Sequence, residues 1–92
     1  MRKPTILIAD NNDDSRRSLL SLLNTEGYMT RDAHNVQGAK RILSRSRVSL
    51  ALVNLRLTKD DDRNDMSGLE VAKMAQEMGI PCIIITAFPS VD

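Results

Sequence analysis

Polar residues follow three apolar runs of this sequence: Asp10 and Asn11 after residues 5–9, Asn54 after residues 50–53, and Thr86 after residues 80–85. If those runs are parallel strands, the side chains that end them open into a cleft at the carboxyl edge of a sheet. A carboxylate at such a place can act as a nucleophile and as a magnesium ligand. The amide of Asn54 can do neither, because its nitrogen lone pair is delocalised into the carbonyl and its oxygen is neutral. Asn54 therefore argues against covalent chemistry at the end of its strand.

A second group of polar residues lies between residues 58 and 67, and it includes the carboxylates of Asp60, Asp61, Asp62 and Asp65. Four carboxylates could recruit a cation, but they lack the Asp-x-Asp-x-Asp-Gly run and the distal glutamate of a calcium-binding loop. The spacing is more typical of a solvated loop, with a docking surface for a basic partner as the alternative. His34 stands alone in a turn, where we expect a surface position rather than a metal or phosphoacceptor role.

Strand and helix patterns alternate along the chain, which predicts an α/β fold with a parallel sheet and right-handed crossovers. The predicted strands are residues 5–9, 28–33, 48–53 and 80–85, with the second at a sheet edge. The first helix is expected to begin at Asp13 or Asp14 and the third to cover residues 68–78. Gly27 and Gly79 are expected to end these two helices.

The apolar residues of the predicted helices recur at helical spacing. Those expected to be buried are Leu19, Leu20, Leu22 and Leu23, then Val36, Ala39, Ile42 and Leu43, and last Leu69, Ala72 and Ala75 or positions near them. The long, flexible side chains of methionine suit gaps in a core, a role expected here for Met29, Met66, Met74 and Met78.

Composition limits the classes of function. The chain of 92 residues is expected to form a single domain over residues 1–92, with an aliphatic core because 41% of the residues are hydrophobic and 2% aromatic. A net charge of +1 gives no basis for nucleic acid or an anionic membrane as the main partner. Cys82 is the single cysteine, so we expect no internal disulfide and a reduced, cytoplasmic setting. No apolar run approaches the ~20 residues that span a bilayer.

Five segments, in the same order along the chain, resemble the receiver domains of bacterial two-component response regulators. They are residues 6–11, Gly27 and Tyr28 with Ala33, residues 51–57, residues 66–70 and residues 80–87. The resemblance implies a flavodoxin-like fold with strand order 2-1-3-4. In that order Asp10, Asn11 and Asn54 meet between the first and third strands, and Thr86 arrives from the fourth.

Three departures from the family pattern bear on function. The resemblance places the phosphoacceptor aspartate of the family at Asn54 and the second member of its acidic, magnesium-binding pair at Asn11. A laboratory change could account for Asn54 but would leave Asn11 unexplained, so natural loss is favoured. The chain ends at Asp92, where the family continues with a helix, a fifth strand that carries a phosphate-binding lysine, and a last helix. The resemblance therefore implies a form that is truncated at its C-terminus.

These departures predict a pseudo-receiver: a regulatory, protein-interaction domain of signal transduction that is not an enzyme. Thr86 matches the switch threonine of the family, but a local hydrogen bond is its expected role. Asp10, without a second carboxylate, is expected to be solvated or to cap a helix. No cofactor is expected, and magnesium binding at Asp10 and Asn11 is expected to be weak at most.

The partners implied by the resemblance are a histidine kinase, another receiver or an effector domain. Two alternatives stay open: a phosphoacceptor that uses Asp10 or a carboxylate of residues 60–65, and an inactive fragment of a longer regulator. An apolar fourth strand without a neighbour also predicts self-association, such as a homodimer through the sheet edge. In that case Ile6, Ile8, Leu52 and Ile84 are expected to contact water in part.

Overall fold

The computed structural model describes residues 3–59 and 62–86 of the chain. Strands and helices alternate in the order β1 (Thr5–Ala9), α1 (Asp13–Thr25), β2 (Met29–Ala33), α2 (Val36–Arg45), β3 (Leu50–Asn54), α3 (Gly68–Glu77) and β4 (Cys82–Ile85). The predicted alternation is confirmed, and β1 has its predicted bounds. None of the helices in these described residues is long and apolar enough to cross a bilayer.

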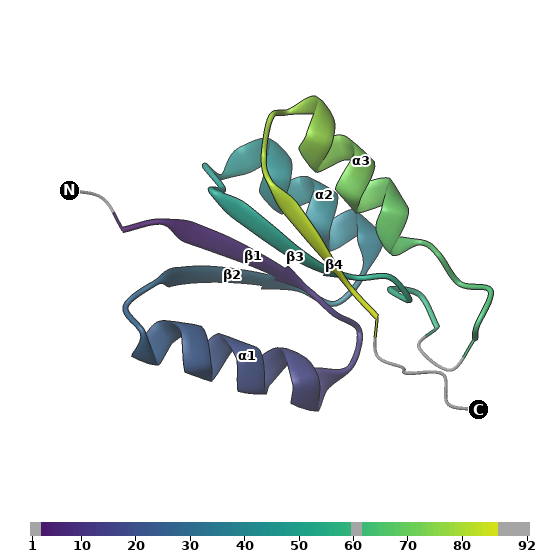
Figure 1. Cartoon of the computed structure of the whole chain (residues 1–92), viewed down its shortest axis with the longest axis horizontal. Coiled ribbons are helices and arrows are strands. Elements are labelled where there is room, and N and C mark those ends of the chain that lie inside the picture. Colours follow the sequence, from purple (N-terminus) through teal and green to yellow (C-terminus); the bar gives the residue numbers. More distant parts are fainter. Residues whose placement is uncertain (1–2, 60–61, 87–92) are drawn as a thin grey trace.

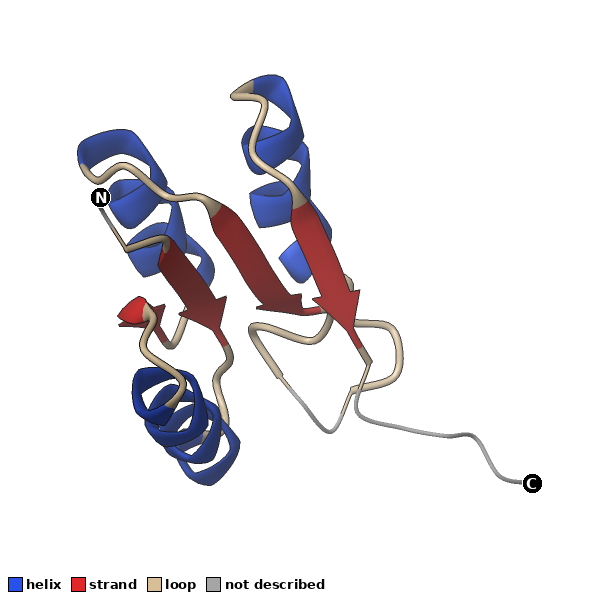
Figure 2. Ribbon diagram, turned by 60° about the vertical axis from the view of Figure 1, so that its left-hand side comes forward, coloured by secondary structure: helices blue, strands red, loops and turns tan. Residues whose placement is uncertain are grey.

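The strands form one parallel sheet in the predicted order β2-β1-β3-β4. Helix α1 covers one face of this sheet, while α2 and α3 lie side by side on the other (Figure 1, Figure 2). The chain therefore enters β1 and β3 at one end of the sheet and leaves both at the opposite end. That arrangement brings the residues after β1 close to the last residue of β3.

The core lies mainly between the sheet and the pair α2 and α3. Successive residues of a strand point to opposite faces, so Ala51 and Val53 share one face with Leu7 and face these two helices. From the helices they meet Ala39, Leu43, Val71 and Ala75, all of which are at most 1% exposed. The fully buried side chains of this cluster are all aliphatic, as the composition predicts.

On the face of the sheet that α1 covers, the exposed positions differ from those predicted. Ile6 and Ile8 are buried, at 4% and 1% exposed, because α1 packs against β1 and β2. On this face of the sheet, the exposed apolar strand residues are Ile83 at 52% and Ile85 at 39%, both on β4. Leu52 and Ile84 are partly buried, as predicted, and Ile84 packs against the core on the other face.

Several predicted core positions on the helices are wrong. Leu22 is 56% exposed and Leu69 is 46% exposed, whereas Val71 is fully buried. Val71 and Ala75 are four residues apart and form the inward face of α3, so Leu69 points away from the sheet. Met29, Met66 and Met78 are also exposed, and Met74 is the one predicted methionine among the described residues that packs on the core.

The ends of the helices follow the predicted chemistry with one addition. Gly27 and Gly79 adopt φ angles of +95° and +74°, which L side chains rarely adopt, and they follow α1 and α3. Helix α1 begins at Asp13, but its cap is Asn12, whose Oδ1 accepts a hydrogen bond of 2.9 Å from the Ser15 amide. The side chain of Asn12 thus fixes the start of α1, directly after Asp10 and Asn11.

Candidate functional site

Asp10 and Asn54 meet at the carboxyl end of the sheet, as predicted. Strands β1 and β3 pair in parallel with Ala9 opposite Val53, so the next residue of each strand lies at the same level. The Nδ2 of Asn54 donates a hydrogen bond of 3.1 Å to Oδ1 of Asp10. Asn54 is 7% exposed and is the one buried polar side chain among the described residues.

The orientation of the Asn54 amide is set from both sides. Its Oδ1 accepts a hydrogen bond of 2.9 Å from the Arg56 backbone amide, while its Nδ2 donates to Asp10. Exchanging the oxygen and nitrogen would break both bonds, because two donors would face each other on one side and two acceptors on the other. Asn54 therefore presents N–H, not oxygen, to the carboxylate of Asp10.

Asp10 is held by backbone as well as by Asn54. Its Oδ1 also accepts a hydrogen bond of 2.9 Å from the amide of Asn12, and its own amide donates to the carbonyl of Ala33. Of the two expected roles, the helix cap is wrong, since Asn12 caps α1, while Asp10 is partly buried and keeps part of its surface in contact with solvent. Asp10 instead braces the turn that leads from β1 into α1.

Asn11 lies beside this pair but faces another segment. Its Nδ2 donates a hydrogen bond of 3.3 Å to the carbonyl oxygen of Thr58, after β3. Its Oδ1 is buried and has no hydrogen-bond partner among the described residues. A buried acceptor without a donor is unfavourable by about 1–3 kcal/mol, so Asn11 is the weakest point of the site.

Arg16 on α1 is a site residue that the sequence did not indicate. Its guanidinium donates to the carbonyl of Asp10 at 2.9 Å, to Asp32 at 2.9 Å and to Asp13 at 2.7 Å. The side chain is 11% exposed, and its hydrogen bond lowers the pKa of Asp13. The acceptors come from the end of β1, from β2 and from α1, so only the folded chain reveals them. Arg16 fixes the backbone that carries Asp10.

The carboxylates between residues 58 and 67 do not form a cation site in the described part of the chain. Asp65 accepts hydrogen bonds from the backbone amides of Thr58, Lys59 and Ser67. Burial alone would raise the pKa of Asp65, but these hydrogen bonds lower it to about 2. Asp60 and Asp61 lie outside the described residues. Asp65 therefore orders the loop, which the sequence had suggested was simply solvated.

Gly68 brings helix α3 against the end of β3. Its amide donates a hydrogen bond of 2.9 Å to the carbonyl of Leu55. A Cβ atom at this position would lie 2.1 Å from the carbonyl oxygen of Asn54. Only glycine permits this approach, so the position of Asn54 depends directly on Gly68.

Thr86 lies at the same end of the sheet, directly after β4, where Ile85 is opposite Asn54. Its side chain is exposed and makes no hydrogen bond within residues 3–59 and 62–86. The structure thus places together Asp10, Asn11 and Asn54, with Thr86 directly after the neighbouring strand β4. His34 is exposed, as expected.

Magnesium is the ion that the family resemblance implies, and the donor set fits it poorly. Asp10 supplies one carboxylate, and its Oδ1 already accepts two hydrogen bonds. Asn54 directs N–H toward that carboxylate, so an approaching cation would meet a donor. In the described residues no group of three or more His, Cys, Asp or Glu could hold a metal ion. Mg²⁺ prefers carboxylate oxygens in octahedral geometry, which these side chains do not provide.

Comparison with known proteins gives consistent matches. The family described as the response regulator receiver domain matches residues 6–92. The response regulator protein PilR of Pseudomonas aeruginosa is 33% identical over 94 aligned residues, and the match covers 100% of this chain but 20% of PilR. The chain therefore spans about a fifth of the length of this relative.

Solved structures give the same result. A receiver domain protein described as CheY-like from Methanospirillum hungatei aligns with a TM-score of 0.82 and 25% identity, covering 98% of this chain and 69% of that protein. A response regulator from Burkholderia pseudomallei, solved with a phosphorylated aspartic acid, a calcium ion and citrate, aligns with a TM-score of 0.75 and 25% identity over 98% of this chain and 50% of that one. With the parallel sheet, its strand order and the family match over residues 6–92, the chain belongs to the response regulator receiver domain family.

Proposed function

We propose that this receiver domain does not accept a phosphoryl group and acts in signal transduction through contacts with other proteins. The observation that supports this proposal most strongly is the hydrogen bond from the Asn54 amide to Asp10. In this arrangement the neutral N–H group takes the place beside Asp10 that a bound cation would occupy. Asp10 and the Asn54 amide are hydrogen-bonded without a metal and without a phosphoryl group, although Oδ1 of Asn11 beside them keeps no partner among the described residues.

The chemistry of phosphoryl transfer explains why this arrangement matters. Transfer to a protein depends on a positioned nucleophile and on cations that neutralise the charge of the transferring group. Asn54 offers no nucleophile, and Asn11 offers an amide oxygen in place of a carboxylate. Binding of a divalent cation, if present, is proposed to be weak for the same reason.

The alternative function, a phosphoacceptor that uses another carboxylate, has less support. Oδ1 of Asp10 accepts hydrogen bonds from Asn12 and Asn54, which leaves only Oδ2 of this carboxylate to attack. Asp65 uses both of its oxygens for backbone amides. The hydrogen bonds that lower the pKa of Asp65 to about 2 also make its carboxylate a weak nucleophile. The second alternative, an inactive fragment of a longer regulator, is distinguished by whether the domain binds a partner at all.

Incubation with acetyl phosphate and magnesium tests the proposal, and intact mass is the readout. We expect no gain of one phosphoryl group, because the nucleophile and one metal ligand are amides. The Asn54→Asp variant is expected to be phosphorylated at best slowly, since Asn11 still replaces a carboxylate. A receiver that retains all its aspartates serves as the positive control.

A stable gain of one phosphoryl group on the unmodified chain would contradict the proposal. Peptide mapping would then locate the phosphate. Phosphate on Asp10 or within residues 60–65 would establish the alternative acceptor.

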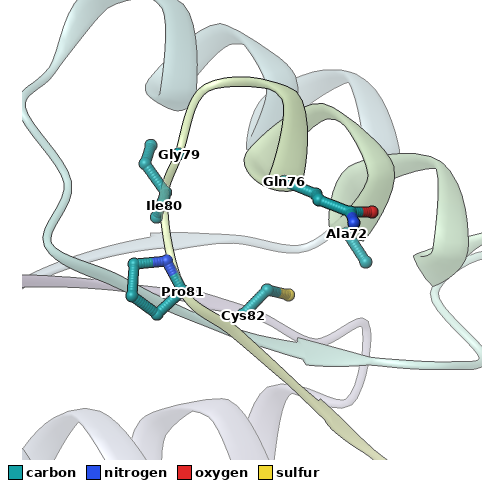
Figure 3. A pocket seen from close by; sticks show the side chains of 6 residues that line it. All are labelled: Ala72, Gln76, Gly79, Ile80, Pro81 and Cys82. Carbon is teal, nitrogen blue, oxygen red and sulfur yellow. The ribbon is translucent and has the colours of Figure 1, made fainter.

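The proposed partners are a histidine kinase, another receiver or an effector domain in the cytoplasm, and the domain is also proposed to self-associate. Strand β4 is the last strand of the described sheet beside β3, and it exposes Ile83 and Ile85. Next to it lies a groove of about 460 Å³ lined by Ala72, Gln76, Gly79, Ile80, Pro81 and Cys82 (Figure 3). A strand edge with exposed apolar side chains is a common site of pairing between chains.

We expect a polypeptide of these 92 residues to form dimers or larger species at micromolar concentration, measured by light scattering after size exclusion. Ile83→Glu should shift the population toward monomer, because it places a charge on the exposed side of β4. Leu69→Glu is the matched control, since Leu69 is similarly exposed but lies on α3. A monomer that melts cooperatively would show that the edge of β4 needs no partner.

A further inference from the structure

Basic side chains gather at the amino end of the sheet, opposite the end that carries Asp10 and Asn54. Two adjoining cavities of about 380 and 280 Å³ lie there and share Lys3, Thr5 and Arg47 in their walls. The larger cavity is also lined by Met29, Arg31, Arg45 and Ser46. We call the four cations Lys3, Arg31, Arg45 and Arg47 the amino-end basic cluster.

The topology of the fold explains why these four cations converge. Lys3 precedes β1, Arg45 is in the last turn of α2, and Arg47 lies in the connection from α2 to β3. Figure 1 shows the start of β1 and this connection at the same end of the sheet. On β2, Arg31 and Ala33 are two residues apart and therefore point to the same face of the sheet. Ala33 is packed in the core beneath α2, so Arg31 also faces the α2 side.

The charges of the basic cluster are not neutralised within the described residues. No carboxylate lines either cavity. The ion pairs of the described chain involve Arg16 and Lys40 and lie elsewhere. The C-terminal end of α2 favours the positive charge of Arg45 through the helix dipole, but Lys3, Arg31 and Arg47 lack such a partner. Four neighbouring cations raise the local potential and attract an anionic ligand.

We propose that the amino-end basic cluster binds an acidic, extended peptide segment of a partner protein. Two features beside the cations favour a peptide. Strand β2 is the outermost strand of the described sheet, so its outer backbone groups can pair with an added strand. Met29 is 54% exposed and supplies an apolar contact within the larger cavity. Alternate side chains of a paired strand point the same way, so carboxylates at every second position would face the cations.

Nucleic acid fits this surface less well than a peptide. The net charge of the chain is +1, and the cations form one compact group rather than a long stripe. No aromatic side chain lines either cavity, so bases have no stacking platform. The surface is at the other end of the sheet from Asn54, so the inference holds whether or not the domain accepts phosphate.

A fluorescent peptide of alternating glutamate and valine, titrated with the full chain at low salt, tests this inference by anisotropy. Saturable binding is expected, and it should weaken as salt increases. The double variant Arg31→Glu, Arg47→Glu should bind at least about tenfold more weakly, since like charges then face the peptide. The matched control is Arg17→Glu, Lys73→Glu, which changes the net charge equally at exposed positions on α1 and α3.

Equal weakening in both double variants would overturn the inference, because it would show a response to net charge alone. An absence of saturable binding, or tighter binding of a DNA or RNA oligonucleotide of equal charge, would overturn it too. So would inorganic phosphate that displaces the peptide at equal concentration. Circular dichroism of each variant checks the fold. If charge reversal unfolds the chain, Arg31→Gln with Arg47→Gln gives the same comparison without adding negative charge.

Discussion

Gly68→Ala is expected to destabilise the domain by about 3 kcal/mol, the upper range for overpacking of a buried site. The added Cβ would lie 2.1 Å from the carbonyl oxygen of Asn54 and 3.0 Å from the Cα of Leu55. Both are backbone atoms, so no side chain can rotate away to relieve the contact. Helix α3 would have to move from the end of β3, and the amide of Gly68 would lose its hydrogen bond to Leu55. Urea unfolding measured by circular dichroism gives the difference in free energy of unfolding.

Gly38→Ala is the matched control, because it makes the same substitution within helix α2. The new Cβ would lie 3.0 Å from Oδ1 of Asn35, which caps α2 by accepting a hydrogen bond from the Gly38 amide, so a shift of this exposed side chain weakens a cap bond worth about 1 kcal/mol. A helical alanine is favoured over glycine by roughly 0.5–1 kcal/mol, which offsets the contact. We expect a net change within about 1 kcal/mol. If Gly68→Ala were as mild as Gly38→Ala, the close contact between α3 and Asn54 would not exist in solution.

Asn54→Asp is expected to destabilise the domain by about 1–3 kcal/mol at neutral pH without divalent cations. The change removes the N–H that now donates to Asp10 at 3.1 Å and places a second negative charge there. Two carboxylates in one partly buried site repel, so the pair holds a proton to higher pH than an exposed carboxyl does. The folded pKa is then raised above the unfolded pKa. The loss of stability is therefore largest at neutral pH and shrinks as the pH falls through the raised folded pKa.

Urea unfolding at neutral and mildly acidic pH measures this dependence for the variant and the unmodified chain. Asn24→Asp is the matched control, since Asn24 is exposed and its Oδ1 only accepts a hydrogen bond from Thr30, which aspartate can keep. A variant Asn54→Asp that is as stable as Asn24→Asp at neutral pH would mean that Asp10 and residue 54 do not interact.

Much of the architecture could be predicted from the sequence. The continuous apolar run of β1 has its predicted bounds, and Gly27 and Gly79 follow α1 and α3 because only glycine readily takes the positive φ that those turns require. Strands β3 and β4 begin two residues later than predicted, at Leu50 and Cys82. Pro81 precedes β4. The first residue of a strand depends on backbone pairing with the neighbouring strand, which hydrophobicity alone does not determine.

Details of burial could not be predicted, because they depend on neighbouring elements. Ile6 and Ile8 are buried because α1 covers β1, while Ile83 and Ile85 are exposed because α1 packs on β1 and β2. Leu22 and Leu69 are apolar residues on helices, but each lies outside the stripe that contacts the sheet.

The meeting of Asp10, Asn11 and Asn54 followed from the predicted strand order, yet the hydrogen bonds did not. The direction of the Asn54 amide depends on the Arg56 backbone, and the role of Arg16 depends on three separate elements. The sequence predicts that Asp65 lies in a solvated loop, but three backbone amides donate hydrogen bonds to its carboxylate. Such contacts require coordinates, because residue type alone does not specify their donors.

The replacement of a cation by the Asn54 amide is tested most directly by thermal melts of the unmodified chain over a millimolar range of magnesium. A ligand that binds only the folded state raises the melting temperature with its concentration. We expect no magnesium-dependent rise for the unmodified chain, whereas Asn54→Asp should show one because two carboxylates then face each other. A rise in the unmodified chain that disappears in Asp10→Ala would show that a cation binds beside Asp10 despite Asn54, and would contradict the proposed site.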